Sequence, residues 1–234
     1  MLSREVKERL REYETPFYLY DMELLRRTVE CALREADRYG YRLHYAMKAN
    51  NDRRIMEFIA SCGMGADCVS GNEVRRAIET GFAPKDIVYA GVGKKDSEII
   101  YALRQGIFAF NCESKNELVV IDALARELGV VADVALRINP DIDPHTHSYI
   151  TTGLSENKFG ISPREITDVV GMLGDLRNID IMGLHFHIGS QITDLGVFAE
   201  LCRKVNASYR WFTEEGFRLS LIHISEPTRH AQIS

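Results

Sequence analysis

The chain has 234 residues, of which 45% are hydrophobic and 27% charged, proportions typical of a globular protein with a packed core. A formal net charge of −5 argues against a general nucleic-acid binder. No apolar run approaches the length of a membrane span, and the charged N-terminus is not a secretory signal. Five scattered cysteines without a CxxC pair indicate reduced thiols. We therefore expect a cytoplasmic protein with no membrane or nucleic-acid partner.

The predicted elements begin with a short polar helix over residues 4–13 and an aromatic strand over residues 15–21. A helix follows from Asp21 to about Tyr39, and Gly40 supplies its C-terminal stop. From there short apolar strands alternate with amphipathic helices. The predicted strands are 42–49, 65–69, 87–90, 108–112, 131–138 and 181–188, and the helices lie near 53–61, 71–80, 95–105, 114–128, 163–174 and 195–215.

This alternation predicts the fold class. Strands that alternate with helices pair in parallel through right-handed crossovers. No GxGxxG follows the first strand, so the repeated units favour an α/β fold of the (β/α)8 barrel type over a doubly wound sheet. In such a barrel the residues that carry the chemistry lie where strands end and loops begin.

Lys48 lies in an apolar run at the end of the first strand of this series. On a strand it shares a face with His44 and Ala46, while Tyr45 and Met47 point the other way. A lysine at the polar end of a strand is the simpler interpretation. The alternative is chemical, because burial lowers the pKa of an amine and gives a neutral nucleophile for a carbonyl group.

Polar side chains also mark the second and fifth strands. Asp67 is predicted near the mouth of the barrel, and Arg137 reaches the same ring of strand ends. A buried arginine needs an anionic partner, which Asp67, Glu73 or a ligand carboxylate or phosphate could supply, unless it only anchors a loop. Glu73 follows Ser70 by three residues, so it belongs either to a capping box or to the site.

His185 and His187 share one face of the sixth predicted strand. An HxH pair on a barrel strand could bind a metal in a hydrolase of the amidohydrolase type, although the expected further His and Asp ligands do not follow. A flat neutral imidazole could instead stack on an aromatic cofactor ring. The turn at Gly189 and Ser190 could then hold a phosphate.

The long loop over residues 140–160 is a further candidate, because loops of this length in compact domains are often functional. His145 and His147 lie in it and could bind a metal. Solvated loop histidines are the simpler interpretation, since no supporting cluster is evident.

Several motifs resemble one family of enzymes. The runs YAMKAN, GADCVSGNE, RINPDIDPHTHSYITTG, NKFGI and GLHFHIGSQI occur in the order found in diaminopimelate decarboxylases, which are fold-type III enzymes that use pyridoxal 5'-phosphate. The resemblance covers roughly residues 14–218. The motifs around Lys48 and His187 are shared with ornithine and arginine decarboxylases, whereas THSYITTG and HIGSQI point to the diaminopimelate branch.

The resemblance implies roles for individual residues. Lys48 resembles the lysine that holds the cofactor covalently, His187 the histidine stacked on its ring, and Ser190 the phosphate contact. The other residues carried over would line the cofactor site: Asp67, Arg137 and Lys158. The implied reaction is the decarboxylation of meso-diaminopimelate to L-lysine in lysine biosynthesis, in a head-to-tail homodimer.

The resemblance also implies domain limits. Residues 1–24 would join a second, β domain built mainly from the C-terminal half of the family's chain, and residues 25–218 would form an incomplete barrel. The family's glycine-rich phosphate loop and its later acidic residue cannot be placed after Arg218. Residues 219–234 resemble a translated sequencing adapter, although 219–224 could also be a true seventh strand. We expect a native frame that stops near Arg218, and a poorly soluble, inactive chain.

Three other functions remain open. One is a single-barrel pyridoxal phosphate carrier of cofactor homeostasis, which would need no β domain. Another is a basic amino-acid decarboxylase of the same fold that acts on a different substrate. The third is a metal-dependent barrel hydrolase that uses His185 and His187.

Overall fold

The computed structural model describes residues 4–140, 159–189 and 195–225. The chain divides into two units, Met1–Arg42 and Leu43–Ser234. None of the helices in the described ranges has both the length and the apolar character needed to cross a bilayer.

The first unit contains two helices, α1 (Arg4–Leu10) and α2 (Met22–Asp37). Asp21 caps α2, and its carboxylate accepts a hydrogen bond from the backbone N–H of Leu24 at 2.9 Å. The strand predicted over residues 15–21 is wrong. That segment pairs with no strand in the described part of the chain, and a β-strand exists only through hydrogen bonds to a neighbour.

The segment between the two helices exposes an unusual number of large apolar side chains. Tyr18 is 84% exposed, and Tyr13, Phe17 and Leu19 are also exposed. Scattered exposed apolar residues are ordinary, but a contiguous run of them favours association with another surface.

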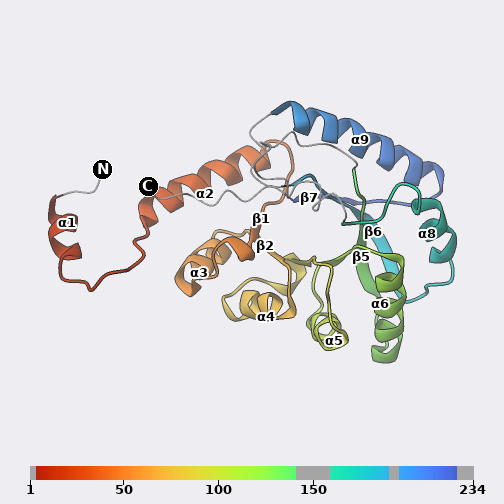
Figure 1. The fold of residues 1–234 in the computed structure, drawn as a ribbon, viewed down its shortest axis with the longest axis horizontal. Coiled ribbons are helices and arrows are strands. Elements are labelled where there is room, and N and C mark those ends of the chain that lie inside the picture. Colours follow the sequence, from red (N-terminus) through yellow and green to blue (C-terminus); the bar gives the residue numbers. More distant parts are fainter. Residues whose placement is uncertain (1–3, 141–158, 190–194, 226–234) are drawn as a thin grey trace. The chain divides into compact units, whose positions relative to one another are not determined.

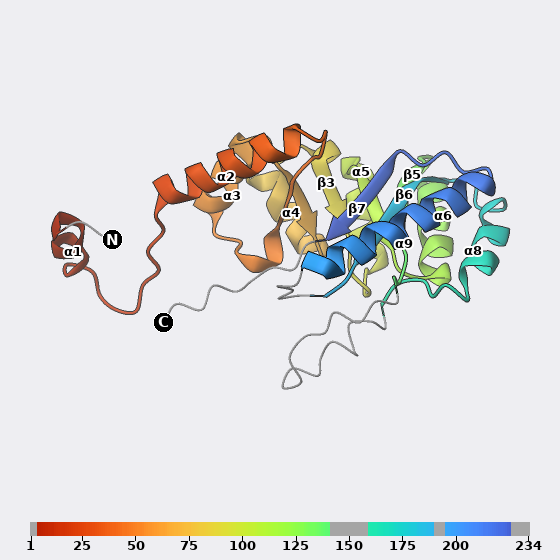
Figure 2. The same cartoon turned by 90° about the horizontal axis from the view of Figure 1, so that it is seen from above.

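The second unit is a sheet of seven strands within the described residues, all parallel and in chain order from β1 to β7 (Figure 1). The strands are β1 (His44–Ala46), β2 (Gly65–Cys68), β3 (Ile87–Tyr89), β4 (Ala109–Cys112), β5 (Ala132–Arg137), β6 (Ile179–His187) and β7 (Leu221–Ser225). The helices are α3 (Arg53–Ser61), α4 (Gly71–Glu79), α5 (Asp96–Gln105), α6 (Lys115–Leu128), α8 (Ile166–Leu173) and α9 (Leu195–Glu214). Figures 1 and 2 show these helices along one face of the curled sheet.

The curl is strong enough that strands far apart in the order face each other across the interior. The imidazole rings of His44 in β1 and His223 in β7 have centroids 6.1 Å apart. His223 also approaches Asn111 of β4, at 2.9 Å between side-chain nitrogens. No ladder joins β1 to β7 among the described residues. The fold is therefore an incomplete (β/α)8 barrel, as predicted, and the described residues form no second β domain.

The core lies between the sheet and its helices. Strand residues that alternate with the interior polar ones point outward and are fully buried: Ala66, Cys68, Val134, Leu136, Leu184 and Phe186. Apolar stripes of the helices cover them, because each helix places apolar residues at a spacing of three and four. Ile55, Met56, Ile59, Val74, Ile99, Leu118 and Ile121 belong to these stripes and are buried.

Most predicted boundaries of the second unit agree with the structure to within two or three residues, but the first strand does not. Residues 42–49 were expected to be one strand, whereas β1 covers only His44–Ala46 and a 3-10 turn covers Met47–Ala49. The chain must turn here to enter α3, which is capped by Asp52. Parallel pairing with β2 extends over only three residues of β1.

Candidate functional site

The carboxyl ends of the parallel strands bring the predicted polar residues to one end of the barrel. Lys48 follows β1 directly, Asp67 lies in β2, and Arg137 and His187 are the last residues of β5 and β6. Their charges interact, since Lys48 and Arg137 both lower the pKa values of Asp67 and His187. The structure therefore brings these four residues together at one end of the barrel.

The interior below this mouth holds a polar cluster. The rings of His185 and His223 stack, with centroids 4.6 Å apart and planes inclined by 23°. His185 Nε2 lies 2.8 Å from Ser225 Oγ, and Ser225 Oγ donates to Asp67 Oδ2 at 3.5 Å. Asn111 also contacts the His223 ring, with Nδ2 and Nδ1 2.9 Å apart. The cluster joins β2, β4, β6 and β7.

Asp67 is the acid of this cluster. Burial raises the pKa of its carboxyl to about 6, against the opposing effects of His44, Lys48, Ser225 and Arg137. Its Oδ1 is buried and has no hydrogen-bond partner among the described residues. An unpaired buried acceptor is costly, so a polar ligand in the barrel would gain a ready partner here.

His185 and His187 lie on the same face of β6, as predicted, and both are kept neutral. Burial is the main cause that lowers the pKa of His187 to about 4, and Arg137 and Lys48 add to it. His185 is only 1% exposed, and burial holds its pKa well below the usual range. Within the described residues no group of three or more His, Cys, Asp and Glu is placed to hold a metal ion.

Lys48 lies on the 3-10 turn and is exposed. The interpretation of a buried, desolvated amine at the end of a strand is therefore wrong. The apolar residues beside Lys48 have the pattern of a continuous strand, which is why the sequence predicted one. In the structure Met47 is buried, and its sulfur lies 3.4 Å from the sulfur of Cys68. The Lys48 amine instead stands at the mouth, where it acts electrostatically on Asp67, Glu73 and His187.

The partner of Arg137 is a residue that sequence reasoning missed. Arg137 Nη1 donates to Glu113 Oε1 at 2.7 Å, and both side chains are largely buried. The expected partners, Asp67 and Glu73, do not make this contact. Glu113 follows β4 directly, so its place at a strand end was the signal that could have found it.

Glu73 takes part in the cap of α4. Ser70 Oγ accepts a hydrogen bond from the Glu73 N–H at 3.2 Å, and Glu73 Oε2 accepts from the N–H of Val69 at 2.7 Å. Burial raises the pKa of its carboxyl. The remaining candidates lie outside the described residues: His145, His147, Lys158 and Ser190.

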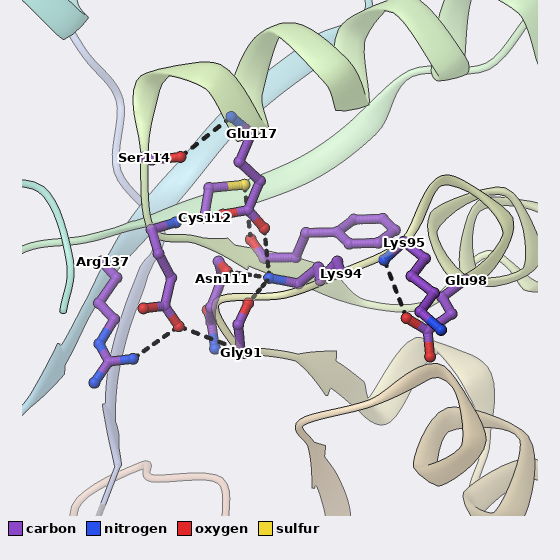
Figure 3. Close-up of polar contacts among 11 residues, drawn as sticks. Gly91, Lys94, Lys95, Glu98, Asn111, Cys112, Ser114, Glu117 and Arg137 are labelled. Atoms are coloured by element: carbon purple, nitrogen blue, oxygen red, sulfur yellow. Dashed lines mark hydrogen bonds and ion pairs between the residues drawn. The ribbon is translucent and has the colours of Figure 1, made fainter.

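A second buried ion pair supports this end of the barrel (Figure 3). Lys94 Nζ donates to Glu117 and to the carbonyl oxygens of Gly91 and Asn111, and its side chain is 1% exposed. Glu117 Oε2 also accepts from the N–H of Glu113 at 2.7 Å. These contacts tie the loop after β3 to the loop after β4.

Replacing Glu117 with alanine is expected to lower the free energy of unfolding by about 3–5 kcal/mol, because it leaves the buried ammonium of Lys94 without its anion. Urea unfolding followed by circular dichroism measures the change. Glu57→Ala, which breaks an exposed pair with Arg53, is the control and should lower the free energy of unfolding much less, because water screens an exposed pair. Equal losses in the two variants would contradict the assignment of Glu117 as a structural anion.

Comparisons with known proteins agree on one family. A family model described as pyridoxal-dependent decarboxylase, pyridoxal binding domain, matches residues 24–225. A diaminopimelate decarboxylase from Bacteroides thetaiotaomicron is 50% identical over 200 residues, which cover 85% of this chain and 52% of that protein. A diaminopimelate decarboxylase from Aquifex aeolicus is 39% identical over 219 residues, covering 94% and 52%.

Solved structures lead to the same enzymes. The crystal structure of diaminopimelate decarboxylase from Helicobacter pylori complexed with L-lysine matches with a TM-score of 0.83 and 37% identity. The match covers 93% of this chain and 55% of that one. The chain thus spans about half the length of the relatives it matches.

Proposed function

This chain belongs to the pyridoxal-dependent decarboxylase family, and on that premise we propose that it is the cofactor-binding part of a diaminopimelate decarboxylase. The reaction proposed for the whole enzyme is the decarboxylation of meso-diaminopimelate to L-lysine. The 50% identity to a diaminopimelate decarboxylase over 200 residues is the observation that carries the proposal.

The described residues fit pyridoxal 5'-phosphate. Lys48 offers an exposed primary amine at the mouth, which an aldehyde can reach. His187 offers a neutral, half-buried imidazole on the same rim. Asp67 Oδ1 and His185 Nδ1 are buried acceptor or donor atoms without a partner among the described residues, as expected where a polar ligand belongs.

When bound, the cofactor supplies a ring that accepts the electron pair left behind by the departing carboxylate. Lys48 would hold the cofactor through its amine and release it when the substrate amine takes its place. His187 would pack against the ring without competing for its charge, because its imidazole is neutral at pH 7. Arg137 would supply a fixed positive charge at the rim of the site.

The partners and location are proposed on the same basis. A small amino acid is the proposed substrate, and a head-to-tail homodimer is the proposed assembly. A cytoplasmic location is supported by the cysteines, since Cys31, Cys62, Cys68, Cys112 and Cys202 are all free thiols.

For residues 219–234 we propose an origin in translated adapter sequence. The structure pairs Leu221–Ser225 with β6, and the family match extends to residue 225. An apolar segment beside an open sheet edge pairs whatever its origin, so these observations fit both alternatives. Reading the gene across codon 218 decides between them, and a contiguous native frame would contradict the proposal.

Titration with pyridoxal phosphate tests the proposed function. Covalent binding through a lysine is expected to give a visible absorbance band with a 1:1 end point. On a gene extended beyond codon 218, carbon dioxide release from meso-diaminopimelate should exceed release from ornithine or arginine. Absence of the band, or release from ornithine alone, would contradict the cofactor or the substrate respectively.

A further inference from the structure

Among the described residues Glu113 has a single side-chain cation as its partner, Arg137, which belongs to the candidate site. Its Oε1 accepts hydrogen bonds from Arg137 Nη1 at 2.7 Å and from the N–H of Gly91 at 3.2 Å. The residue is 7% exposed, and its Oε2 has no partner in the described part of the chain. One carboxylate oxygen therefore joins the end of β5 to the loop after β3.

The backbone of Glu113 is fixed independently of its side chain. Glu117 Oε2 accepts from the Glu113 N–H at 2.7 Å, and Ser114 caps α6 by accepting from the N–H of Glu117 at 3.3 Å. Lys94 has its own anion in Glu117. Figure 3 shows Lys94 and Arg137 on opposite sides of Gly91, each with a separate set of contacts. Within the described residues the Glu113 carboxylate therefore pairs with Arg137 and not with Lys94.

The described residues occupy only part of the hydrogen-bonding capacity of the Arg137 guanidinium. Its Nη1 binds Glu113, and its guanidinium carbon lies 5.8 Å from the centroid of the Phe159 ring. Its Nε and second Nη have no hydrogen-bond partner among the described residues, although an arginine carries five N–H donors. Its charge reaches the site, since it acts on Asp67 and His187.

We propose that Glu113 is a positioning residue that fixes the Arg137 guanidinium at the mouth, so that its unengaged N–H groups bind an anionic oxygen of the cofactor. The proposal rests on the proposed function of the site. The charged hydrogen bond to Glu113 restrains one edge of the Arg137 guanidinium. The remaining N–H groups are then held in one orientation before the ligand binds, so less conformational freedom is lost on binding. Gly91, held by the same oxygen, fixes Glu113 from the other side.

Affinity for pyridoxal phosphate in the full chain measures this role. Glu113→Ala is expected to weaken binding about tenfold, and Glu113→Gln, which keeps one acceptor oxygen, about threefold. Because Glu113 acts through Arg137, the double variant Glu113→Ala with Arg137→Met should bind no more weakly than Arg137→Met alone. Additive losses, or wild-type affinity in Glu113→Ala, would overturn the proposal.

The same titration with pyridoxal, which lacks the phosphate, identifies the oxygen. Weakening with both ligands places Arg137 on the ring oxygen, and weakening with pyridoxal phosphate alone places it on the phosphate. Either result supports the role of Glu113. Wild-type affinity for both ligands in Glu113→Ala would overturn it.

A measurement without cofactor keeps this inference separate from the proposed function. The Nη1–H resonance of Arg137, assigned by its loss in Arg137→Met, should be protected from exchange in the parent chain and in the control Glu57→Gln, which changes an exposed carboxylate paired with Arg53. It should broaden or disappear in Glu113→Ala. If the parent binds no cofactor, the proposed function fails while this comparison still decides whether Glu113 holds Arg137. An unchanged resonance in Glu113→Ala would overturn the proposal even in a folded variant.

Discussion

Replacing Lys48 with alanine is expected to abolish the visible absorbance of bound pyridoxal phosphate and its covalent trapping by borohydride. Lys48 is the exposed amine that follows β1 at the mouth of the barrel. Lys94, which Figure 3 shows beside Glu117, is buried and paired with that residue, so it cannot replace Lys48. Loss of the covalent bond should weaken apparent affinity by at least about 100-fold, or about 2.8 kcal/mol.

Reduction with borohydride followed by peptide mass spectrometry measures this directly. The phosphopyridoxyl group should appear on the peptide that contains Lys48 in the parent and on no peptide in Lys48→Ala. Lys95→Ala is the matched control, because Lys95 is also exposed and lies in a loop that follows a strand. Retained absorbance in Lys48→Ala, or trapping on Lys95 in the parent, would refute the assignment.

The sequence predicted the barrel because its signals are local. Each strand is a short apolar run and each helix an amphipathic stretch, so their alternation predicts a parallel α/β fold, and the missing GxGxxG favours the barrel over a doubly wound sheet. The same local reasoning failed for residues 15–21, where an aromatic run has strand propensity but finds no strand to pair with among the described residues. Strand propensity needs a partner, and a partner is a property of the whole fold.

The candidate site was predicted only in part, for a similar reason. Parallel strands must place their carboxyl ends together, so the convergence of Lys48, Asp67, Arg137 and His187 follows from the fold class. The pairing of Arg137 with Glu113 depends instead on the turn after β4. The hydrophobic periodicity of the sequence does not predict the conformation of such a turn. The exposure of Lys48 likewise depends on where β1 ends, and strand limits are the least certain part of a sequence-based prediction.

Acidification is expected to destabilise the chain between about pH 6.5 and pH 4, because the barrel interior keeps three histidines neutral. The folded pKa values of His187 and His223 are lowered to about 4, and that of His185 is lower than usual as well. In the unfolded chain these imidazoles titrate near 6.5, so unfolding takes up protons in this window. Their contribution to stability is therefore complete above pH 6.5 and is lost as the pH falls toward 4.

Asp67 acts in the opposite direction. Its folded pKa is raised to about 6 from an ordinary value of 3.8, so the folded state binds the extra proton between these values. Acidification through that window therefore relieves the cost of the buried carboxylate. On acidification the three imidazoles make the unfolded chain bind more protons than the folded one, and Asp67 offsets only one of these protons. The net effect is therefore a loss of stability. Asp67→Asn removes the opposing effect, so stability should fall more steeply on acidification, by about 1.4 kcal/mol per pH unit.

Urea unfolding between pH 4 and pH 7 measures both slopes. At pH 7, Asp67→Asn should be more stable than the parent by roughly 1–3 kcal/mol, because it replaces a buried charge with a neutral amide of the same shape. Asp175→Asn, which changes an exposed carboxylate, is the control and should follow the parent at every pH. Parallel curves for Asp67→Asn and the parent would show that the Asp67 carboxyl titrates as it does in the unfolded chain. The interior of the barrel would then be wet enough to solvate a charge, and the neutral imidazole proposed to pack against the cofactor would lose its physical basis.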